Sequence, residues 1–241
     1  MKNSQAQTQA FTRTELIIVV AMLGLVGLLF VRAQDDPAPR EKQQRLECMK
    51  NLKMMNLAFR MWANDNSGSF PMKVPAAKGG AKEAIDTGET FRHFAVLSNY
   101  LQEVKYLSCP SDERAGANSF EATRNTPDSS LKENPKVRVD SFDTLRNTNL
   151  SYFVGLEADE TKPQMLLSGD RNLTNGLPLK NGVMTLIPGA PEGWTAALHR
   201  ENGNLALADG SVQQVTMAGL RRQIQAQELS TPGPKRLQLP E

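Results

Sequence analysis

The sequence predicts an α+β protein in which a long N-terminal helix, interrupted at prolines, packs on a small antiparallel β-sheet. Three observations lead to this class. An uninterrupted apolar run covers residues 16–31, an apolar stripe with helical spacing follows it, and the second half alternates short apolar stretches with turn-forming residues. The chain has 241 residues, of which 39% are hydrophobic and 22% charged, which fits one globular domain with an appended segment.

The apolar run carries a carboxylate at its start. As a helix, residues 16–31 extend over about 24 Å, whereas a helix that begins at residue 11 covers the ~30 Å hydrocarbon core of a membrane. Glu15 then lies in the first turn, where an ionisable group costs about 2.5 kcal/mol or more unless it finds a partner. We therefore expect residues 11–34 to form a transmembrane or assembly helix in which Glu15 has a function.

Three interpretations of the N-terminus remain open. The first is a secretory signal peptide that is cleaved before Gln34, and the second is a plain membrane anchor. In the third, a leader of residues 1–10 is removed between Ala10 and Phe11, and Glu15 becomes the fifth residue of the mature chain. The third gives the carboxylate a partner, because the new α-amino group of one subunit can pair with Glu15 of its neighbour.

A linker and an amphipathic helix are expected over residues 35–66. Pro37 and Pro39 favour the end of the first helix near Gln34 and suit the first turn of a new one. Asn64 and Gly68 lie in "NDNSG", which is typical of a helix stop. One face of the new helix is expected to meet a core, because its apolar residues follow three- and four-residue spacing: Leu46, Met49, Leu52, Met55, Phe59 and Trp62.

Residues 67–229 are expected to form an α+β head. Asp209 and Gly210 favour a two-residue type I′ turn between two strands, and "ENGN" at 201–204 predicts a second turn and a three-stranded meander. Helices are expected at 89–101 and 217–229. The proline-rich residues 230–241 predict a flexible tail. Strands are expected wherever short apolar stretches lie between turn residues: 104–109, 150–155, 164–169, 195–199, 204–208 and 212–215.

Composition and motifs exclude several function classes. The net charge of +2 comes from the first 34 residues, so the rest is neutral and lacks the basic footprint of a nucleic-acid binder. No Gly-x-Ser-x-Gly motif occurs, and neither histidine has a zinc-type spacing with cysteines. For an enzyme, the best acid, base or ligand set is His199, Asp209 and Asp170. We expect no catalysis, because Asp209 has a structural role in its turn.

Specific segments carry a family resemblance. "FTRTELIIVVAMLGLV" resembles the N-terminus of type IV pilins and type II secretion pseudopilins, although Ala10, Arg13 and Thr14 depart from the usual pattern. The head resembles a planctomycete and verrucomicrobial branch of pseudopilin-like proteins. Its last motif is a histidine, nine residues and then Asp-Gly, which "HRENGNLALADGSV" matches at His199, Asp209 and Gly210.

The resemblance implies a pilin-like fold and a structural role without catalysis. The chain would be a subunit of a type II secretion pseudopilus or a related filament, held in the bacterial inner membrane by one pass with its head in the periplasm. Implied partners are neighbouring subunits, a prepilin peptidase, an inner-membrane platform and an assembly ATPase. No cofactor is expected, although calcium is a candidate at the loops 168–172 and 208–211. No metal ligand is assigned.

The implied topology places Cys48 and Cys109 in the periplasm, where disulfides persist. Cys48 lies on the amphipathic helix and Cys109 follows an expected strand, so we expect one bridge to join helix and sheet. Such a bridge closes a loop of about sixty residues and contributes roughly 4 kcal/mol in the chain-entropy model. The alternative is two buried thiols.

Overall fold

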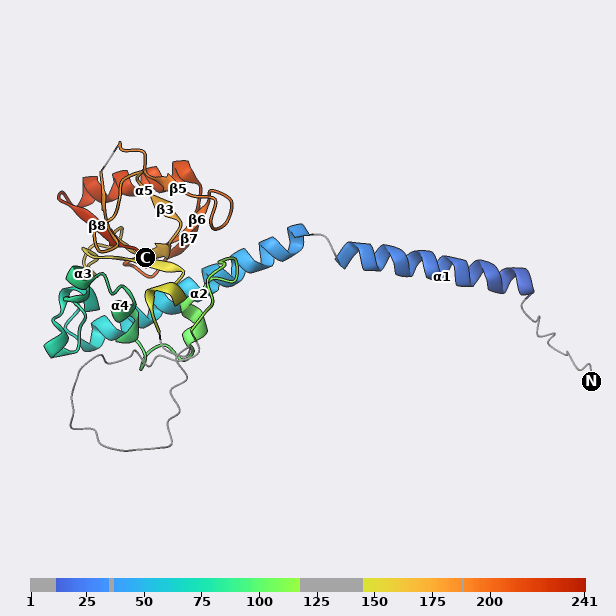
Figure 1. Cartoon of the computed structure of the whole chain (residues 1–241), viewed down its shortest axis with the longest axis horizontal. Helices are drawn as coiled ribbons and strands as arrows, with labels where there is room; N and C mark the ends of the chain where they lie inside the picture. The colour runs from blue at the N-terminus through green and yellow to red at the C-terminus, as the bar shows by residue number, and fades with distance from the viewer. Residues whose placement is uncertain (1–11, 35–36, 118–144, 188) are drawn as a thin grey trace, which may run out of the picture. The chain divides into compact units, whose positions relative to one another are not determined.

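The structure, a computed structural model, describes residues 12–34, 37–117, 145–187 and 189–241 (Figure 1). Contacts divide the chain into two compact units, Met1–Lys42 and Gln43–Glu241. The first unit contains helix α1, Arg13–Gln34. Helix α1 ends at Gln34, the residue near which the sequence predicted its end. The predicted first residue, Phe11, lies outside the described residues.

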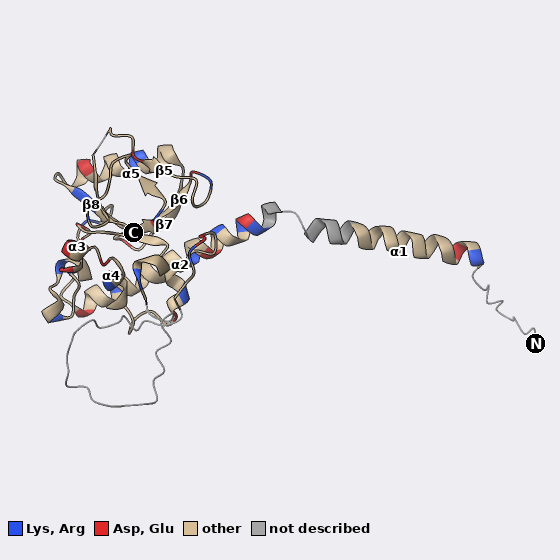
Figure 2. Ribbon diagram, in the orientation of Figure 1, with Lys and Arg blue, Asp and Glu red and all other residues tan. Residues whose placement is uncertain are grey.

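Helix α1 exposes apolar side chains on all sides. Apart from Arg13 and Glu15 at its start, its described side chains are uncharged (Figure 2). Within the described residues, no helix combines the length and hydropathy needed to cross a membrane. The large apolar side chains of α1 are between 45% and 67% exposed: Leu16, Ile17, Ile18, Val19, Val20, Met22, Leu23, Leu25, Val26 and Leu28.

Helix α2, Pro37–Asp65, begins at the first of the two prolines, as predicted. It ends where "NDNSG" begins to turn: the Gly68 amide donates to the Ala63 carbonyl at 2.8 Å, with Gly68 at φ 73°. Most of the predicted stripe is confirmed, because Leu52, Met55, Phe59 and Trp62 are buried. The prediction is wrong for Leu46, which is 58% exposed, because Cys48 takes the core-facing position in that turn.

The head is built on a six-stranded antiparallel sheet with the order β4-β8-β1-β2-β6-β7. A second sheet pairs two short strands, β3 and β5. The strands are β1 Tyr152–Gly155, β2 Leu166–Asp170, β3 Leu173–Thr174, β4 Val183–Leu186, β5 Gly193–Trp194, β6 Gly203–Leu207, β7 Val212–Val215 and β8 Lys235–Gln238.

Both faces of the large sheet are covered. Alternate residues of a strand point to opposite faces, so Tyr152 and Val154 of β1 join the core beneath α2, whereas Phe153 joins the core beneath α5, Met217–Ser230. Figure 1 shows α2 and α5 on opposite sides of the sheet. The predicted α+β class and the packing of α2 on an antiparallel sheet are confirmed.

The smaller helices agree in part with the sequence. Helix α5 is confirmed, and Thr216 caps it by accepting a hydrogen bond from the Gly219 amide. In place of a helix over 89–101, the structure has only α4, Phe91–Ala95, followed by turns that still bury Leu97 and Leu101. The remaining short helices are α3 Ala84–Thr87, η1 Pro71–Lys73, η2 Ala76–Lys78, η3 Val104–Leu107 and η4 Asn147–Asn149.

Two expected strands are absent from the described chain. Residues 104–109 contain the 3₁₀ helix η3 instead of a strand. Residues 195–199 form no strand, and Asn172 Nδ2 donates to two carbonyls of this segment, those of Thr195 and Leu198 at 2.9 Å each, and to the Asn202 carbonyl beyond it at 3.1 Å. The predicted meander is therefore wrong, and β6 pairs with β2 and β7.

The predicted β6–β7 hairpin is confirmed, but the predicted type I′ turn is wrong. The Gly210 amide donates to the Leu207 carbonyl at 3.0 Å, and the Leu207 amide donates to the Ser211 carbonyl at 2.9 Å. Gly210 has a φ of 94°, whereas Asp209 is not among the residues with positive φ. The connection is thus a three-residue loop with glycine in the left-handed position, whereas a type I′ turn needs positive φ at two residues.

The prediction of a flexible tail is also wrong. Strand β8 lies between β4 and β1 in the sheet. Leu237 and Leu239 are buried in the core beneath α5. Lys235 is only 5% exposed, and its amino group donates to the carbonyls of Thr231 and Gly233. Composition misled the prediction, because two apolar residues spaced by two are enough for a strand between two neighbours.

Candidate functional site

Glu15 closes a capping box at the start of α1. Its Oε2 accepts hydrogen bonds from the amide and hydroxyl of Thr12, both at 2.8 Å, and its own amide donates to Thr12 Oγ1 at 3.4 Å. Thr12 and Glu15 thus satisfy amides that the first turn of a helix leaves without partners. The cleavage residues Ala10 and Phe11 lie outside the described residues.

Cys48 of α2 and Cys109 form a disulfide in the structure, with an S–S distance of 2.01 Å and a sequence separation of 61. Hydrogen bonds hold both ends of this bridge against β1. The Tyr152 hydroxyl donates to the Cys48 carbonyl at 3.2 Å, and the Cys109 amide donates to the Ser151 hydroxyl at 2.9 Å. The expected pairing of Cys48 with Cys109 is present, but the bridge joins α2 to the loop that follows η3 instead of to a strand.

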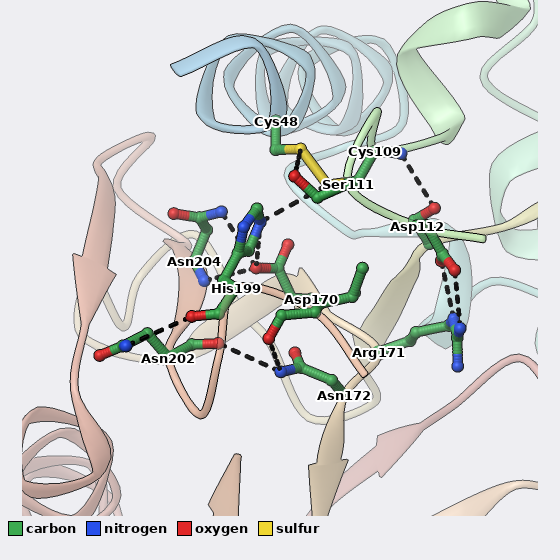
Figure 3. Close-up of polar contacts among 12 residues, drawn as sticks. Cys48, Cys109, Ser111, Asp112, Asp170, Arg171, Asn172, His199, Asn202 and Asn204 are labelled. Carbon is green, nitrogen blue, oxygen red and sulfur yellow. Dashed lines mark hydrogen bonds and ion pairs between the residues drawn. A yellow bond between two sulfur atoms is a disulfide. The ribbon is translucent and has the colours of Figure 1, made fainter. Parts of the chain in front are cut away.

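His199 and Asp170 lie beside this bridge (Figure 3). His199 Nε2 is 3.5 Å from Cys109 Sγ and 3.4 Å from Asp170 Oδ2. The two side chains are 1% and 0% exposed. Neither His199 Nδ1 nor Asp170 Oδ1 has a hydrogen-bond partner among the described residues.

Burial keeps both groups of this pair neutral near pH 7. It raises the pKa of Asp170 to about 8 against two opposing hydrogen bonds from Asn204, whose backbone amide and side-chain amide donate to Oδ2 at 2.8 and 3.0 Å. Burial also lowers the pKa of His199 to about 4, and Arg45 adds to this shift. The Asp170 carboxyl group and the His199 imidazole thus lie in contact near pH 7 with both groups predominantly neutral.

The backbone at His199 adopts an unusual conformation. His199, Arg200 and Glu201 have φ values of 50°, 51° and 61°, a left-handed run that costs roughly 1–2 kcal/mol per residue without glycine. Two asparagines hold the segment in place. Asn172 binds three carbonyls that flank it, and Asn202 Nδ2 donates to the carbonyls of His199 and Arg200. The surrounding structure therefore fixes His199 in a position that its own backbone disfavours.

Asp209 and Gly210 lie at the opposite end of β6 from His199. The Asp209 carboxylate accepts from the Ser211 amide at 2.8 Å, and its carbonyl accepts from Arg60 NH1 of α2 at 2.9 Å. A Cβ atom on Gly210 would lie 2.6 Å from Arg60 NH1. Gly210 thus permits both the positive φ and the close approach of Arg60.

The spacing between the histidine and the Asp-Gly pair matches the length of β6 along α2. His199 lies next to the bridge from Cys48, and the other end of β6 contacts Arg60. Twelve helical residues from Cys48 to Arg60 extend about 18 Å, and the five-residue strand β6 extends about 17 Å. Between these ends, Asn56 Nδ2 of α2 donates to the Leu207 carbonyl at 2.9 Å. Asn56 and Arg60 of α2 thus hold the hairpin end of β6, whereas His199, which precedes β6, lies next to Cys109 and Asp170.

The structure does not bring the expected enzymatic set together. His199 meets Asp170, but Asp209 belongs to the distant hairpin. Cys109, His199 and Asp170 are adjacent, yet His199 uses the single atom Nε2 toward both neighbours, whereas a charge-relay triad uses both ring nitrogens. Cys109 is also in the disulfide and offers no nucleophile.

One group among the described residues has the proximity to hold a metal ion. The ligand atoms of Cys48, Cys109 and His199 all lie within 4.8 Å of one another. Thiolate and imidazole donors suit zinc, whereas calcium requires oxygen ligands. In the loops considered for calcium, Asp170 binds Asn204 and Asp209 caps its own turn.

Sequence reasoning missed several supporting residues. Asn172 lies in the loop 168–172, which was considered for calcium, and Asn204 lies where the expected turn 201–204 meets the expected strand 204–208. Asp112 and Arg171 form a two-bonded ion pair with both distances at 2.7 Å. Although burial raises the pKa of Asp112, the hydrogen bonds from Arg171 and other donors hold it below its ordinary value. The polar residues within "CPSD" and "SGDRN" were the available signal for these contacts, because polar groups that become buried need hydrogen-bond partners.

No protein-family model, curated protein or solved structure matches the chain.

Replacing Gly210 should loosen the hairpin from α2. We expect Gly210→Ala to lower the free energy of unfolding by about 1–2 kcal/mol for the left-handed backbone, and by about 0.5–1 kcal/mol more for the lost hydrogen bond from Arg60. Gly79→Ala is the matched control, because Gly79 has a φ of 83° and no atom within 4 Å of the added Cβ. Urea unfolding measures both, and equal losses would contradict the contact with Arg60.

Stability should depend on pH through Asp170. Because the folded pKa is about 8 and the ordinary value is 3.8, the folded protein keeps a proton that the unfolded chain has released, and stability falls as pH rises between them. Burial lowers the pKa values of His199 and His93 to about 4. These two groups make stability rise with pH, but only below their ordinary pKa of 6.5. From pH 6.5 to 8 we expect the free energy of unfolding to fall by an amount on the order of 2 kcal/mol.

Asp170→Asn provides the comparison, because asparagine is similar in shape and does not titrate. Urea unfolding at several pH values should show a smaller slope in this variant over pH 6.5–8. The assignment to Asp170 fails if wild type and variant have the same slope.

Proposed function

We propose that this chain is a pilin-like structural subunit of a type II secretion pseudopilus or a related type IV filament. The observation that carries the proposal is the exposed apolar surface of α1, which extends around the helix from Leu16 to Leu28. A helix that is apolar on all sides requires an apolar environment. In a filament, the α1 helices of neighbouring subunits provide it.

Glu15 supplies the charge in this packing. It is the one acidic residue in the first turn of α1, and the rest of the described helix offers no counter-charge beyond Arg13. After removal of residues 1–10, the α-amino group at Phe11 of a neighbouring subunit becomes that partner. The pairing aligns subunits, because an unpaired charge among apolar helices is costly.

Processing and location follow from the same proposal. A prepilin peptidase cuts between Ala10 and Phe11, and the subunit waits in the inner membrane with its head in the periplasm. An inner-membrane platform and an assembly ATPase then add it to the filament. The membrane location is inferred from the sequence, in which the apolar run continues from residue 16 to residue 31.

The head serves a mechanical role in this proposal. Its contacts with α2 are spread along the helix, from the disulfide at Cys48 through Asn56 to Arg60. Force applied through α2 therefore reaches the sheet at several points. Such a subunit needs no active site to extend a fibre that moves exported proteins outward.

A periplasmic protein released by signal-peptide cleavage is the second candidate. The buried arrangement of Cys109, His199 and Asp170 favours it, because such groups lie together in chemical sites more often than in plain cores. N-terminal sequencing separates the candidates. The filament subunit begins at Phe11, whereas a cleaved signal peptide gives a chain that begins at Gln34.

Two substitutions separate the charge of Glu15 from its capping role. Glu15→Gln keeps the capping box, since glutamine also serves at this position, but removes the charge. Thr12→Ala removes the side-chain half of the cap and keeps the charge. We expect Glu15→Gln to abolish filament assembly and Thr12→Ala to retain it, as measured by sheared-filament yield and electron microscopy in cells that express the assembly machinery.

Immunoblots of membrane fractions control for the amount of processed subunit. Normal assembly of Glu15→Gln would show that the carboxylate acts only as a cap. Loss of assembly in Thr12→Ala alone would lead to the same conclusion.

A further inference from the structure

We propose that Cys48, Cys109 and His199 form a zinc site when the two cysteines are thiols, with Asp170 as the fourth ligand. We call these four residues the thiol–histidine cluster. The proposal goes beyond the filament role and does not depend on it.

The spacing of the donor atoms supports the proposal. Tetrahedral ligands at about 2.0–2.3 Å from zinc lie roughly 3.3–3.8 Å from one another. His199 Nε2 is 3.5 Å from Cys109 Sγ and 3.4 Å from Asp170 Oδ2, and the three cysteine and histidine donors lie within 4.8 Å of each other. Once the S–S bond is absent, a rotation of the cysteine side chains brings the sulfurs to the separation that zinc requires.

Two buried polar atoms of the cluster lack partners. Asp170 Oδ1 and His199 Nδ1 have none among the described residues, although the side chains are 0% and 1% exposed. A buried polar atom without a partner requires an explanation, and a cation bound by the carboxylate supplies one for Asp170 Oδ1, whereas His199 Nδ1 carries the ring proton.

Supporting residues hold the ligands in position. Asn204 donates two hydrogen bonds to Asp170 Oδ2, as outer residues commonly do for ligating carboxylates. Asn172 and Asn202 fix the turn that carries His199. Nε2, directed at Cys109, is the nitrogen available to the metal, and Nδ1 keeps the proton. The site is therefore largely formed before the metal arrives.

The disulfide and the zinc site are alternative crosslinks between α2 and the head. Cys48 contributes from α2, and the other three ligands come from the head. Zinc binding releases the two thiol protons and the Asp170 proton to solvent, and it leaves two thiolates and a carboxylate as ligands. Exchange with a disulfide of an external oxidant forms the Cys48–Cys109 bond and releases the metal. That oxidant accepts the two electrons, takes two protons from solvent and is reduced to two thiols. The head thus has one crosslink for reducing conditions and one for oxidising conditions.

Cobalt titration of the reduced full-length protein tests the proposal. A trialkylphosphine and water convert the disulfide to two thiols and leave the phosphine oxide, and excess reagent is removed without air. We expect one Co²⁺ per chain with thiolate charge-transfer absorption and tetrahedral visible bands, which Zn²⁺ displaces. The oxidised protein should give neither signal.

Variants assign the ligands. Cys48→Ser with Cys109→Ser should abolish the charge-transfer absorption, and His199→Gln should remove the tetrahedral bands. Asp170→Asn should weaken binding by about 10- to 100-fold, the range for a supporting or weak ligand. His93→Gln is the matched control, because His93 is equally buried but bonds to Gln238 at 2.8 Å, and it should bind cobalt as wild type does.

A wild-type measurement keeps the test independent of variant folding. Zinc should protect both thiols of the reduced protein from alkylation, as mass spectrometry reports. The proposal is overturned if the reduced protein gives no charge-transfer absorption, if zinc leaves the alkylation rate unchanged, or if the double serine variant binds cobalt as tightly as wild type.

Discussion

The attachment of α2 to the sheet is the constraint on which the head depends. Helix α2 covers one face of the sheet, and its buried residues share one core with the inward residues of β1, β2 and β6. The disulfide from Cys48 and several hydrogen bonds position it, among them those from Asn56 and Arg60. Apolar burial supplies most of the stabilisation, whereas these contacts fix the register of helix against strand.

The same attachment explains why polar groups are buried at its centre. His199, Asp170 and their asparagines occupy a region where an apolar core would be simpler, and His199 lies in a disfavoured backbone conformation. Proteins keep such arrangements where the surrounding structure over-determines them, often at sites with a chemical role.

Much of the fold could be predicted from the sequence, but the surroundings of the site could not. Helices α1, α2 and α5 have sustained apolar patterns, and β1, β2, β6 and β7 are apolar stretches between turn residues. Strand β8 was missed because its stability comes from neighbours distant in sequence. The segment 195–199 resembles a strand locally but forms none, and the Asn172 side chain that binds two of its carbonyls comes from outside it. His199 and Asp170 were identified as candidates, but their contact with the disulfide is purely tertiary.

The central claim is that a disulfide between Cys48 and Cys109 joins α2 to the head. Peptide mapping by mass spectrometry tests it most directly, on protein isolated without reductant and treated with an alkylating agent before digestion. The account predicts a linked peptide pair that contains Cys48 and Cys109 and no alkylated cysteine. Recovery of both cysteines in alkylated form would contradict it.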